Sequence, residues 1–199
     1  MSLGVGLLVF ALSMVLQTRL LGMGSFVPQF FPQINSAAGA GTSYQVPSSP
    51  VRLRIPAIGV DAHVQSVGLA WQGTGDMGIP TNFTDVGWYK DGPLPGAPGS
   101  AVIDGHLDGK DVPQAVFYNL GKLRAGDLVE VEGEDGKTLQ FRVLETKLYD
   151  YNAPTTDVFS SDVSKSRLNL ITCAGDWDKS QKLYNKRVVV FTELVPNVQ

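Results

Sequence analysis

The sequence has few of the residues that build metal centres and covalent cross-links. It contains a single cysteine, Cys173, and two histidines, His63 and His106. One cysteine cannot form an internal disulfide. One cysteine with two widely separated histidines also lacks the ligand spacing of a structural zinc site. We therefore expect no metal and no cofactor.

Positive charge is also scarce, and it is spread along the chain. The 16 Lys and Arg residues are outnumbered by 19 Asp and Glu residues, which leaves a formal net charge of −3. No basic cluster stands out, so the sequence lacks the electrostatic footprint of a protein that binds nucleic acid. We expect no DNA or RNA partner.

Charge is absent from the N-terminal segment as far as Arg19, and residues 3–16 are all apolar, Gly or Ser. In length this run lies between the apolar region of a signal peptide and a full membrane span. The motif Ala38-Gly39-Ala40 lies too far downstream to be its cleavage site. We predict an uncleaved membrane anchor over residues 1–24. The alternative, a buried core helix, fits poorly because the run shows no amphipathic stripe.

An anchor of this kind implies a single-pass membrane protein, and we expect its catalytic domain to lie outside the cell. Arg19 follows the apolar run and no Lys or Arg precedes it, a distribution that by itself favours the opposite orientation. Residues 25–50 contain no charged side chain and are rich in Pro, Gly, Ser, Ala, Asn and Gln. Such a composition buries too little apolar area to fold, so we predict a flexible tether there and a folded domain over residues 51–199.

The remaining chain shows short strand patterns separated by turn residues. We predict extended segments over residues 51–55, 58–67, 99–104, 127–132, 137–148, 167–173 and 187–194. The turn Glu134-Asp135-Gly136 predicts a hairpin. Helical spacing of apolar residues occurs in this region only over residues 114–123. Many short strands with no alternating β/α pattern predict a mainly β protein, a closed or nearly closed barrel with one or two short helices, preceded by the N-terminal apolar helix.

The lone cysteine closes the apolar, β-branched run of residues 168–173, and Ala174-Gly175-Asp176 follows it. We expect the strand to end at the thiol. The attacking species of a cysteine nucleophile is the thiolate, so it needs a histidine that can exchange its proton. His106 follows the predicted strand at residues 99–104 and precedes a polar loop, where a side chain can face a groove. Buried cysteines and loop histidines are also common without function, which leaves catalysis and packing both open.

His63 lies inside a strand pattern, which is typical of a side chain on one face of a sheet. Attack of a thiolate on a carbonyl further requires a group that stabilises the oxyanion. Arg187 opens the predicted last strand, beside the strand that ends in Cys173, although a surface arginine at a strand start has the same pattern. Lys186 is expected to point to the opposite face, because side chains alternate along a strand.

Three parts of the chain together resemble the sortases, the cysteine transpeptidases of the Gram-positive cell surface. The run Asn169-Leu170-Ile171-Thr172-Cys173 is similar to the sortase signature Thr-Leu-x-Thr-Cys, with Asn169 in place of the first Thr. Gly87-Trp88-Tyr89 and residues 95–106 resemble the segment that carries the sortase histidine, and Arg187 has the place of the sortase arginine. The resemblance covers residues 51–194 and is nearest to the class E and class F sortases.

The resemblance implies an eight-stranded barrel in which Cys173, His106 and Arg187 meet in one groove. It implies that Cys173 attacks the Thr–Gly carbonyl of an LPXTG-like sorting signal and forms a thioacyl intermediate. An amine of a cell-wall precursor or a pilin then resolves it. His106 exchanges protons with the leaving and incoming amines, Arg187 holds the substrate and the oxyanion, and Thr172 positions the nucleophile or the bound peptide.

Two other functions are compatible with the same residues. A cysteine hydrolase of the same fold would use water in place of the amine. A non-catalytic, surface-anchored binding module would use Cys173 for packing alone. An L,D-transpeptidase is disfavoured, because the cysteine of those enzymes follows a Ser/His-Gly step that is absent before Cys173.

Overall fold

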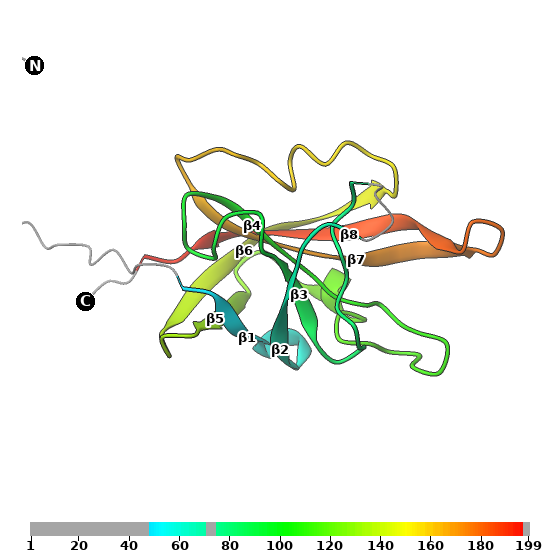
Figure 1. The fold of residues 1–199 in the computed structure, drawn as a ribbon, viewed down its shortest axis with the longest axis horizontal. Coiled ribbons are helices and arrows are strands. Elements are labelled where there is room, and N and C mark those ends of the chain that lie inside the picture. The colour runs from blue at the N-terminus through cyan, green and yellow to red at the C-terminus, as the bar shows by residue number, and fades with distance from the viewer. Residues whose placement is uncertain (1–47, 71–74, 197–199) are drawn as a thin grey trace, which may run out of the picture. The chain divides into compact units, whose positions relative to one another are not determined.

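The computed structural model describes residues 48–70 and 75–196, which form a closed β-barrel (Figure 1). The strand order around the barrel is β1-β2-β3-β4-β7-β8-β6-β5. Neighbouring strands are antiparallel except at β2–β3 and β4–β7, which are parallel. The expectation of a closed, eight-stranded, mainly β fold is confirmed. The predicted anchor and all but the last residues of the predicted tether lie outside the described residues, as does the predicted N-terminal helix.

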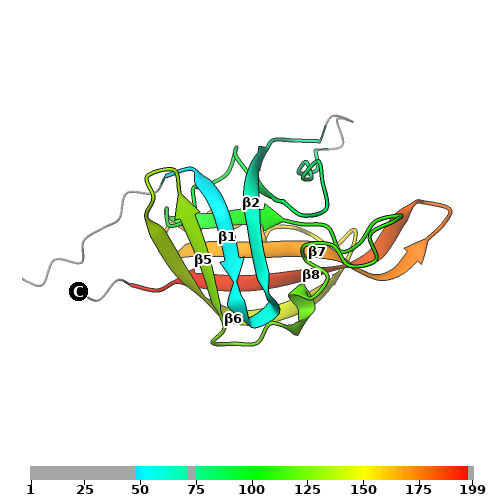
Figure 2. The same ribbon diagram turned by 90° about the horizontal axis from the view of Figure 1, so that it is seen from below.

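Tight turns connect β5 to β6 and β7 to β8, whereas long loops connect β2 to β3, β4 to β5 and β6 to β7 (Figure 2). The strands are β1 (Pro50–Ile55), β2 (Val60–Val67), β3 (Val86–Tyr89), β4 (Gly99–Asp104), β5 (Leu128–Gly133), β6 (Thr138–Asp150), β7 (Ser166–Asp178) and β8 (Leu183–Leu194). The predicted hairpin is β5–β6, whose turn contains Gly136 in the left-handed region at φ 74°. Glycine adopts this conformation without steric cost, which is why the Asp-Gly step identified the turn.

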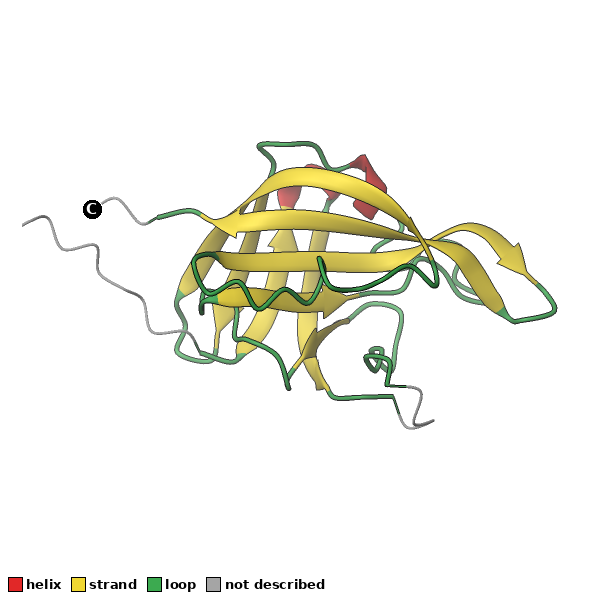
Figure 3. Ribbon diagram, turned by 90° about the horizontal axis from the view of Figure 1, so that it is seen from above, coloured by secondary structure: helices red, strands yellow, loops and turns green. Residues whose placement is uncertain are grey.

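Helix is confined, among the described residues, to two 3₁₀ turns, η1 (Pro56–Ile58) and η2 (Leu120–Lys122) (Figure 3). The helix predicted over residues 114–123 is therefore reduced to its last turn. The amides of Tyr118, Leu120, Lys122 and Leu123 each donate to the carbonyl three residues back, the 3₁₀ pattern, and not to the fourth. The start of the segment is tied elsewhere, since the Val116 amide donates to the Phe83 carbonyl and the Phe117 amide to the His106 carbonyl. The apolar residues of this stretch are spaced as they are because they are buried: the side chains of Phe117 and Leu120 are both fully buried. No helix in these residues is long and apolar enough to cross a membrane.

The core fills the barrel interior with side chains that alternate along each strand. On β7, Leu168 and Leu170 are fully buried and belong to the interior cluster. Ile171, between them and Cys173, packs on a second cluster outside the barrel wall. The members of this outer cluster are Val102, Val158, Val189 and Phe191. The connection between β6 and β7 contributes Val158 and passes over the outer face of β4, β7 and β8 (Figure 1).

We expect Leu170→Ala to lower the free energy of unfolding by about 2–5 kcal/mol, because it opens a cavity in the barrel interior. Leu148→Ala, a matched change at a leucine that is 62% exposed, should cost about 0.5 kcal/mol or less. Urea denaturation of the two variants measures the difference. Equal losses would contradict the placement of the core.

Candidate active site

Cys173 and Arg187 lie directly opposite each other on β7 and β8. The prediction that the strand ends at Cys173 and that Arg187 opens the last strand is wrong, because β7 runs on to Asp178 and β8 begins at Leu183. The Ala174-Gly175-Asp176 segment produces a register shift, with Gly175 at φ 78°. A glycine in this conformation bulges the ladder without ending it. Both residues are thus held in the middle of a long hairpin.

The Arg187 guanidinium is anchored at one end. Its Nη1 donates to the backbone carbonyls of Tyr184 at 2.9 Å and Lys186 at 2.8 Å. Within the described residues, its Nε and Nη2 have no hydrogen-bond partner. Lys186 is opposite Ala174 and forms an ion pair with Asp150, on the other face of the strand. Arg187 therefore presents two free donor nitrogens on the same face of the hairpin as the thiol.

The parallel pairing of β4 with β7 brings His106 next to Cys173. Asp104 is aligned with Ile171, and the Gly105 amide continues the ladder with a 3.2 Å bond to the Ile171 carbonyl. Gly105 in turn accepts a 2.7 Å bond from the Thr172 hydroxyl. Gly105 and Thr172 are therefore side by side, and the residues that follow them are His106 and Cys173.

The side chain of Thr172 is buried, and its hydroxyl is occupied by Gly105. It therefore ties β7 to the end of β4 from inside the barrel. Gly105 must be a glycine here, because a Cβ at this position would lie 2.6 Å from a ring carbon of Phe117. This close approach explains why a glycine directly precedes His106.

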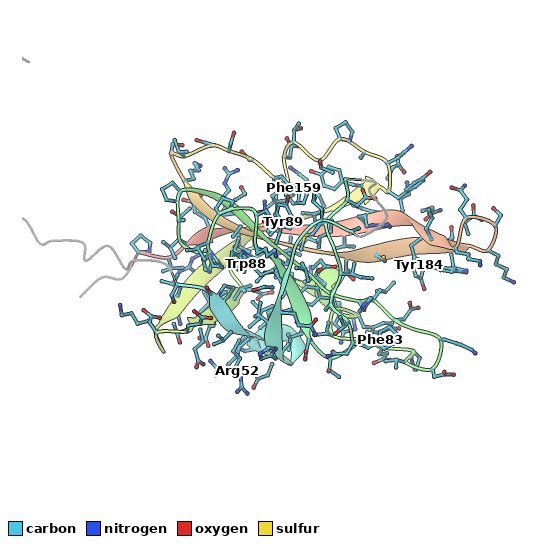
Figure 4. The ribbon with its side chains drawn as sticks, viewed as in Figure 1. Arg52, Phe83, Trp88, Tyr89, Phe159 and Tyr184 are labelled. Atoms are coloured by element: carbon cyan, nitrogen blue, oxygen red, sulfur yellow. The ribbon has the colours of Figure 1, made fainter. Side chains whose placement is uncertain are left out.

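The imidazole of His106 is held by residues from the connection between β2 and β3. Its Nε2 lies 3.0 Å from the Pro80 carbonyl oxygen, and its ring packs on Phe83 at 4.9 Å between centroids. Figure 4 labels Phe83, at the lower right of the view. A carbonyl only accepts, so Nε2 carries a hydrogen and Nδ1 is the nitrogen available for proton exchange. No hydrogen bond joins His106 to Cys173 in the part of the chain that is described.

His63 is not part of this arrangement. Its side chain is 67% exposed on β2, where Nδ1 lies 3.8 Å from the carboxylate of Asp85. Across residues 48–70 and 75–196, no group of three or more His, Cys, Asp or Glu side chains is placed to hold a metal ion.

The surroundings of the thiol act on its ionisation in opposite directions. Burial raises the pKa of Cys173, the Arg187 guanidinium lowers it, and the carboxylates of Asp104 and Asp108 raise it again. The balance lies above the ordinary thiol value, so most molecules carry a neutral thiol at neutral pH.

Asp104 is a residue that the sequence analysis missed. It lies on β4 between Gly87 and Ile171, and its Oδ1 is buried with no hydrogen-bond partner among the residues that the structure describes. Burial raises the pKa of its carboxyl to about 8. A Cβ on Gly87 would lie 2.7 Å from that oxygen, so the glycine makes room for it. The sequence does contain a signal that could have identified this residue: a carboxylate, two residues before His106, ends a predicted strand that is otherwise uncharged.

The raised pKa of Asp104 makes stability depend on pH. The folded state favours the protonated carboxyl, so this contribution is complete below about pH 4 and is lost as pH rises to about 8. We expect Asp104→Asn to gain stability relative to the native protein between pH 5 and pH 9 by more than about 1.4 kcal/mol, the equivalent of one pKa unit. Denaturation at the two pH values measures this gain, with the exposed Asp91→Asn as control. A constant difference would show that Asp104 titrates normally.

Comparisons with known proteins agree with this geometry. The family model described as Sortase domain matches residues 53–195. Sortase C-1 of Actinomyces oris is similar at 25% identity and a TM-score of 0.55, with 74% of this chain and 76% of that chain covered. A sortase D5 transpeptidase of Clostridium perfringens is similar at 20% identity and a TM-score of 0.54, covering 74% and 79%. A lid mutant of sortase A from Corynebacterium diphtheriae shares 18% identity at a TM-score of 0.57, covering 77% and 74%.

No curated protein matches the chain. The family model nevertheless spans well over half of the sequence and includes His106, Cys173 and Arg187. The resemblance found in the sequence is thereby confirmed: the chain belongs to the sortase family.

Proposed function

We propose that this protein is a cysteine transpeptidase that cleaves an LPXTG-like sorting signal between Thr and Gly and transfers the acyl group to an amine. The observation that carries the proposal is the placement of Cys173 between two neighbours. Arg187 lies opposite it on β8, and His106 follows the strand beside it. A nucleophile, a proton carrier and a cationic donor are thus brought to one position of the sheet.

In the first half of the reaction, the Cys173 thiolate attacks the carbonyl carbon of the Thr–Gly bond and forms a tetrahedral oxyanion. When the carbon–nitrogen bond breaks, protonated His106 gives its Nδ1 proton to the leaving amine. This leaves the acyl group on the sulfur as a thioester. Because burial raises the pKa of the thiol, the reactive form with thiolate and imidazolium is a minor fraction of the protein.

In the second half, the acceptor amine loses a proton to Nδ1 of neutral His106 and attacks the thioester carbonyl. The carbon–sulfur bond then breaks, a new amide forms, and the thiolate is regenerated. Arg187 serves both halves, because its free Nε and Nη2 can donate to the oxyanion while Nη1 stays on the backbone. Thr172 keeps Cys173 and His106 aligned through its bond to Gly105.

We expect Cys173→Ala and His106→Ala each to abolish cleavage of a sorting-signal peptide, with a loss of at least about 10³-fold, because each removes a reacting group. Neither side chain is fully buried, so both variants should keep the melting temperature of the native protein within a few degrees. His63→Ala is the matched control and should retain full activity, since its side chain is 67% exposed away from the site. A thioacyl adduct on Cys173, detected by mass spectrometry, is expected in the native protein. Full turnover by either of the first two variants would exclude the mechanism.

The acceptor separates a transpeptidase from a hydrolase of the same fold. With a peptide substrate and an added amine such as triglycine, we expect the product to be the new amide. Without the amine, slow release of the free acid should follow. An unchanged yield of free acid at every amine concentration would identify a hydrolase.

The same proposal extends to the location of the enzyme. We propose that residues 1–24 anchor the chain in the cell membrane and that residues 25–50 hold the catalytic domain outside it. The apolar composition of the first segment, whose one charged side chain is Arg19, and the Pro, Gly and Ser content of the second support this arrangement. The Gly87-Trp88-Tyr89 motif on β3 and the Pro-Gly motifs of the loop that follows it support assignment to class E or class F within the family.

A further inference from the structure

Tyr184 connects two parts of the active site that are far apart in the sequence. Its hydroxyl donates a 2.5 Å hydrogen bond to Oδ2 of Asp108, 76 residues away. Its backbone carbonyl accepts the 2.9 Å bond from Nη1 of Arg187. One residue therefore touches the loop that carries His106 and the guanidinium that faces Cys173.

Tyr184 is itself fixed by the hairpin. It is paired with Trp177 across β7 and β8, and the two rings meet at 5.2 Å between centroids in an edge-to-face arrangement. Such a contact limits the rotation of the phenol. Figure 4 shows Tyr184 on the part of the hairpin that extends past the other strands.

The loop after His106 has its other attachments on the opposite side. The Phe83 ring packs on His106, and it lies so close to Gly109 that a Cβ there would be 2.5 Å from a ring carbon. Pro80 accepts from the imidazole. The start of the loop is held to β7 at Gly105, and the Phe117 and Ala115 amides donate to the carbonyls of His106 and Leu107. Within the described residues, the hydrogen bond that links this loop to β8 is the one between Tyr184 and Asp108. Removing the Tyr184 hydroxyl would therefore leave the loop without a hydrogen bond to the strand that carries Arg187.

We propose that Tyr184 and Asp108 form a positioning pair that holds the His106 loop at a fixed place relative to Cys173 and Arg187. This inference rests on the proposed function. Neither residue reacts with the substrate; the pair acts through the groups that it positions. A hydrogen bond to a carboxylate is stronger and shorter than one between neutral groups, which suits this purpose.

The pair also contributes charge near the nucleophile. The Asp108 carboxylate raises the pKa of Cys173, and its hydrogen bond raises the pKa of Tyr184 to about 12. Replacing the carboxylate with an amide should therefore lower the thiol pKa, while removing the hydroxyl should not. The titratable or charged groups around the thiol are Arg187 and Tyr184 from β8, Asp104 from β4, and His106 and Asp108 from the following loop.

The test compares Tyr184→Phe with Asp108→Asn in the full chain. We expect Tyr184→Phe to lower kcat for the sorting-signal peptide about tenfold or more with little change in KM, because the bond is lost and the histidine loop is no longer held. Asp108→Asn should lose less, because the Asn side-chain oxygen still accepts from the hydroxyl. It should also shift the midpoint of iodoacetamide alkylation of Cys173 to lower pH, a shift that Tyr184→Phe should not produce. In the double variant, the losses in kcat should not add.

Each variant has a matched control. Tyr118→Phe removes the hydroxyl of an exposed tyrosine, and Asp111→Asn removes a carboxylate from an exposed position of the same loop. Both should behave like the native protein. If Tyr184→Phe retains kcat within twofold, the pair has no positioning role. If Asp108→Asn leaves the alkylation midpoint where Asp111→Asn leaves it, the Asp108 carboxylate does not lie near the thiol, and the placement of the pair beside the site is wrong. If the native protein forms no thioacyl product at all, the proposed function fails, and the alkylation curves, measured without substrate, still decide the placement of Asp108.

Discussion

The pairing of β7 with β4 on one side and β8 on the other is the constraint on which the site depends. The register of each ladder fixes which residues are neighbours, and a shift of one residue would turn Cys173 to the other face. The parallel ladder with β4 sets His106 beside the thiol, and the antiparallel ladder with β8 sets Arg187 opposite it. The fully buried Leu168 and Leu170 hold this register, because a slip would expose both to the outer face. The same register is therefore needed to bury the two leucines and to bring Cys173, His106 and Arg187 together.

The electrostatics of the site follow from its place on the outer face of a closed sheet. A thiol half-buried against β4 and β8 loses solvation, and burial dominates its pKa, with Arg187 opposing the effect. The Asp108 carboxylate adds negative charge on the side of β4, and Asp104 adds its own only as the pH rises past about 8, where its carboxyl ionises. A neutral resting thiol is less open to oxidation than a thiolate, which would suit the location outside the membrane that we propose. In the proposed mechanism the reactive ion pair of thiolate and imidazolium is a minor form of the protein, because burial raises the pKa of the thiol.

Local signals predicted the strands well and the ends of elements poorly. The Asp-Gly turn identified β5–β6 because a left-handed glycine is a property of the turn itself. The helix expected over residues 114–123 is replaced by 3₁₀-type turns, and the start of this segment is fixed by bonds from the Val116 and Phe117 amides to the carbonyls of Phe83 and His106. The break expected after Cys173 is a bulge, since Asn185 accepts from the Asp176 amide and keeps β7 paired with β8. In both cases a partner distant in the sequence decided the outcome.

The sequence by itself determined the mainly β class and the family, and it supplied the cysteine, the histidine and the arginine that we propose for the site. These depend on residue type and on local motifs such as Thr172-Cys173 and Gly105-His106. Only the tertiary structure decided which groups surround them. The buried carboxyl of Asp104, the inward hydroxyl of Thr172 and the bond from Tyr184 to Asp108 all arise from contacts across strands or loops. Closure of the barrel brings these groups together. The residue pattern along one strand does not show which other strands become its neighbours.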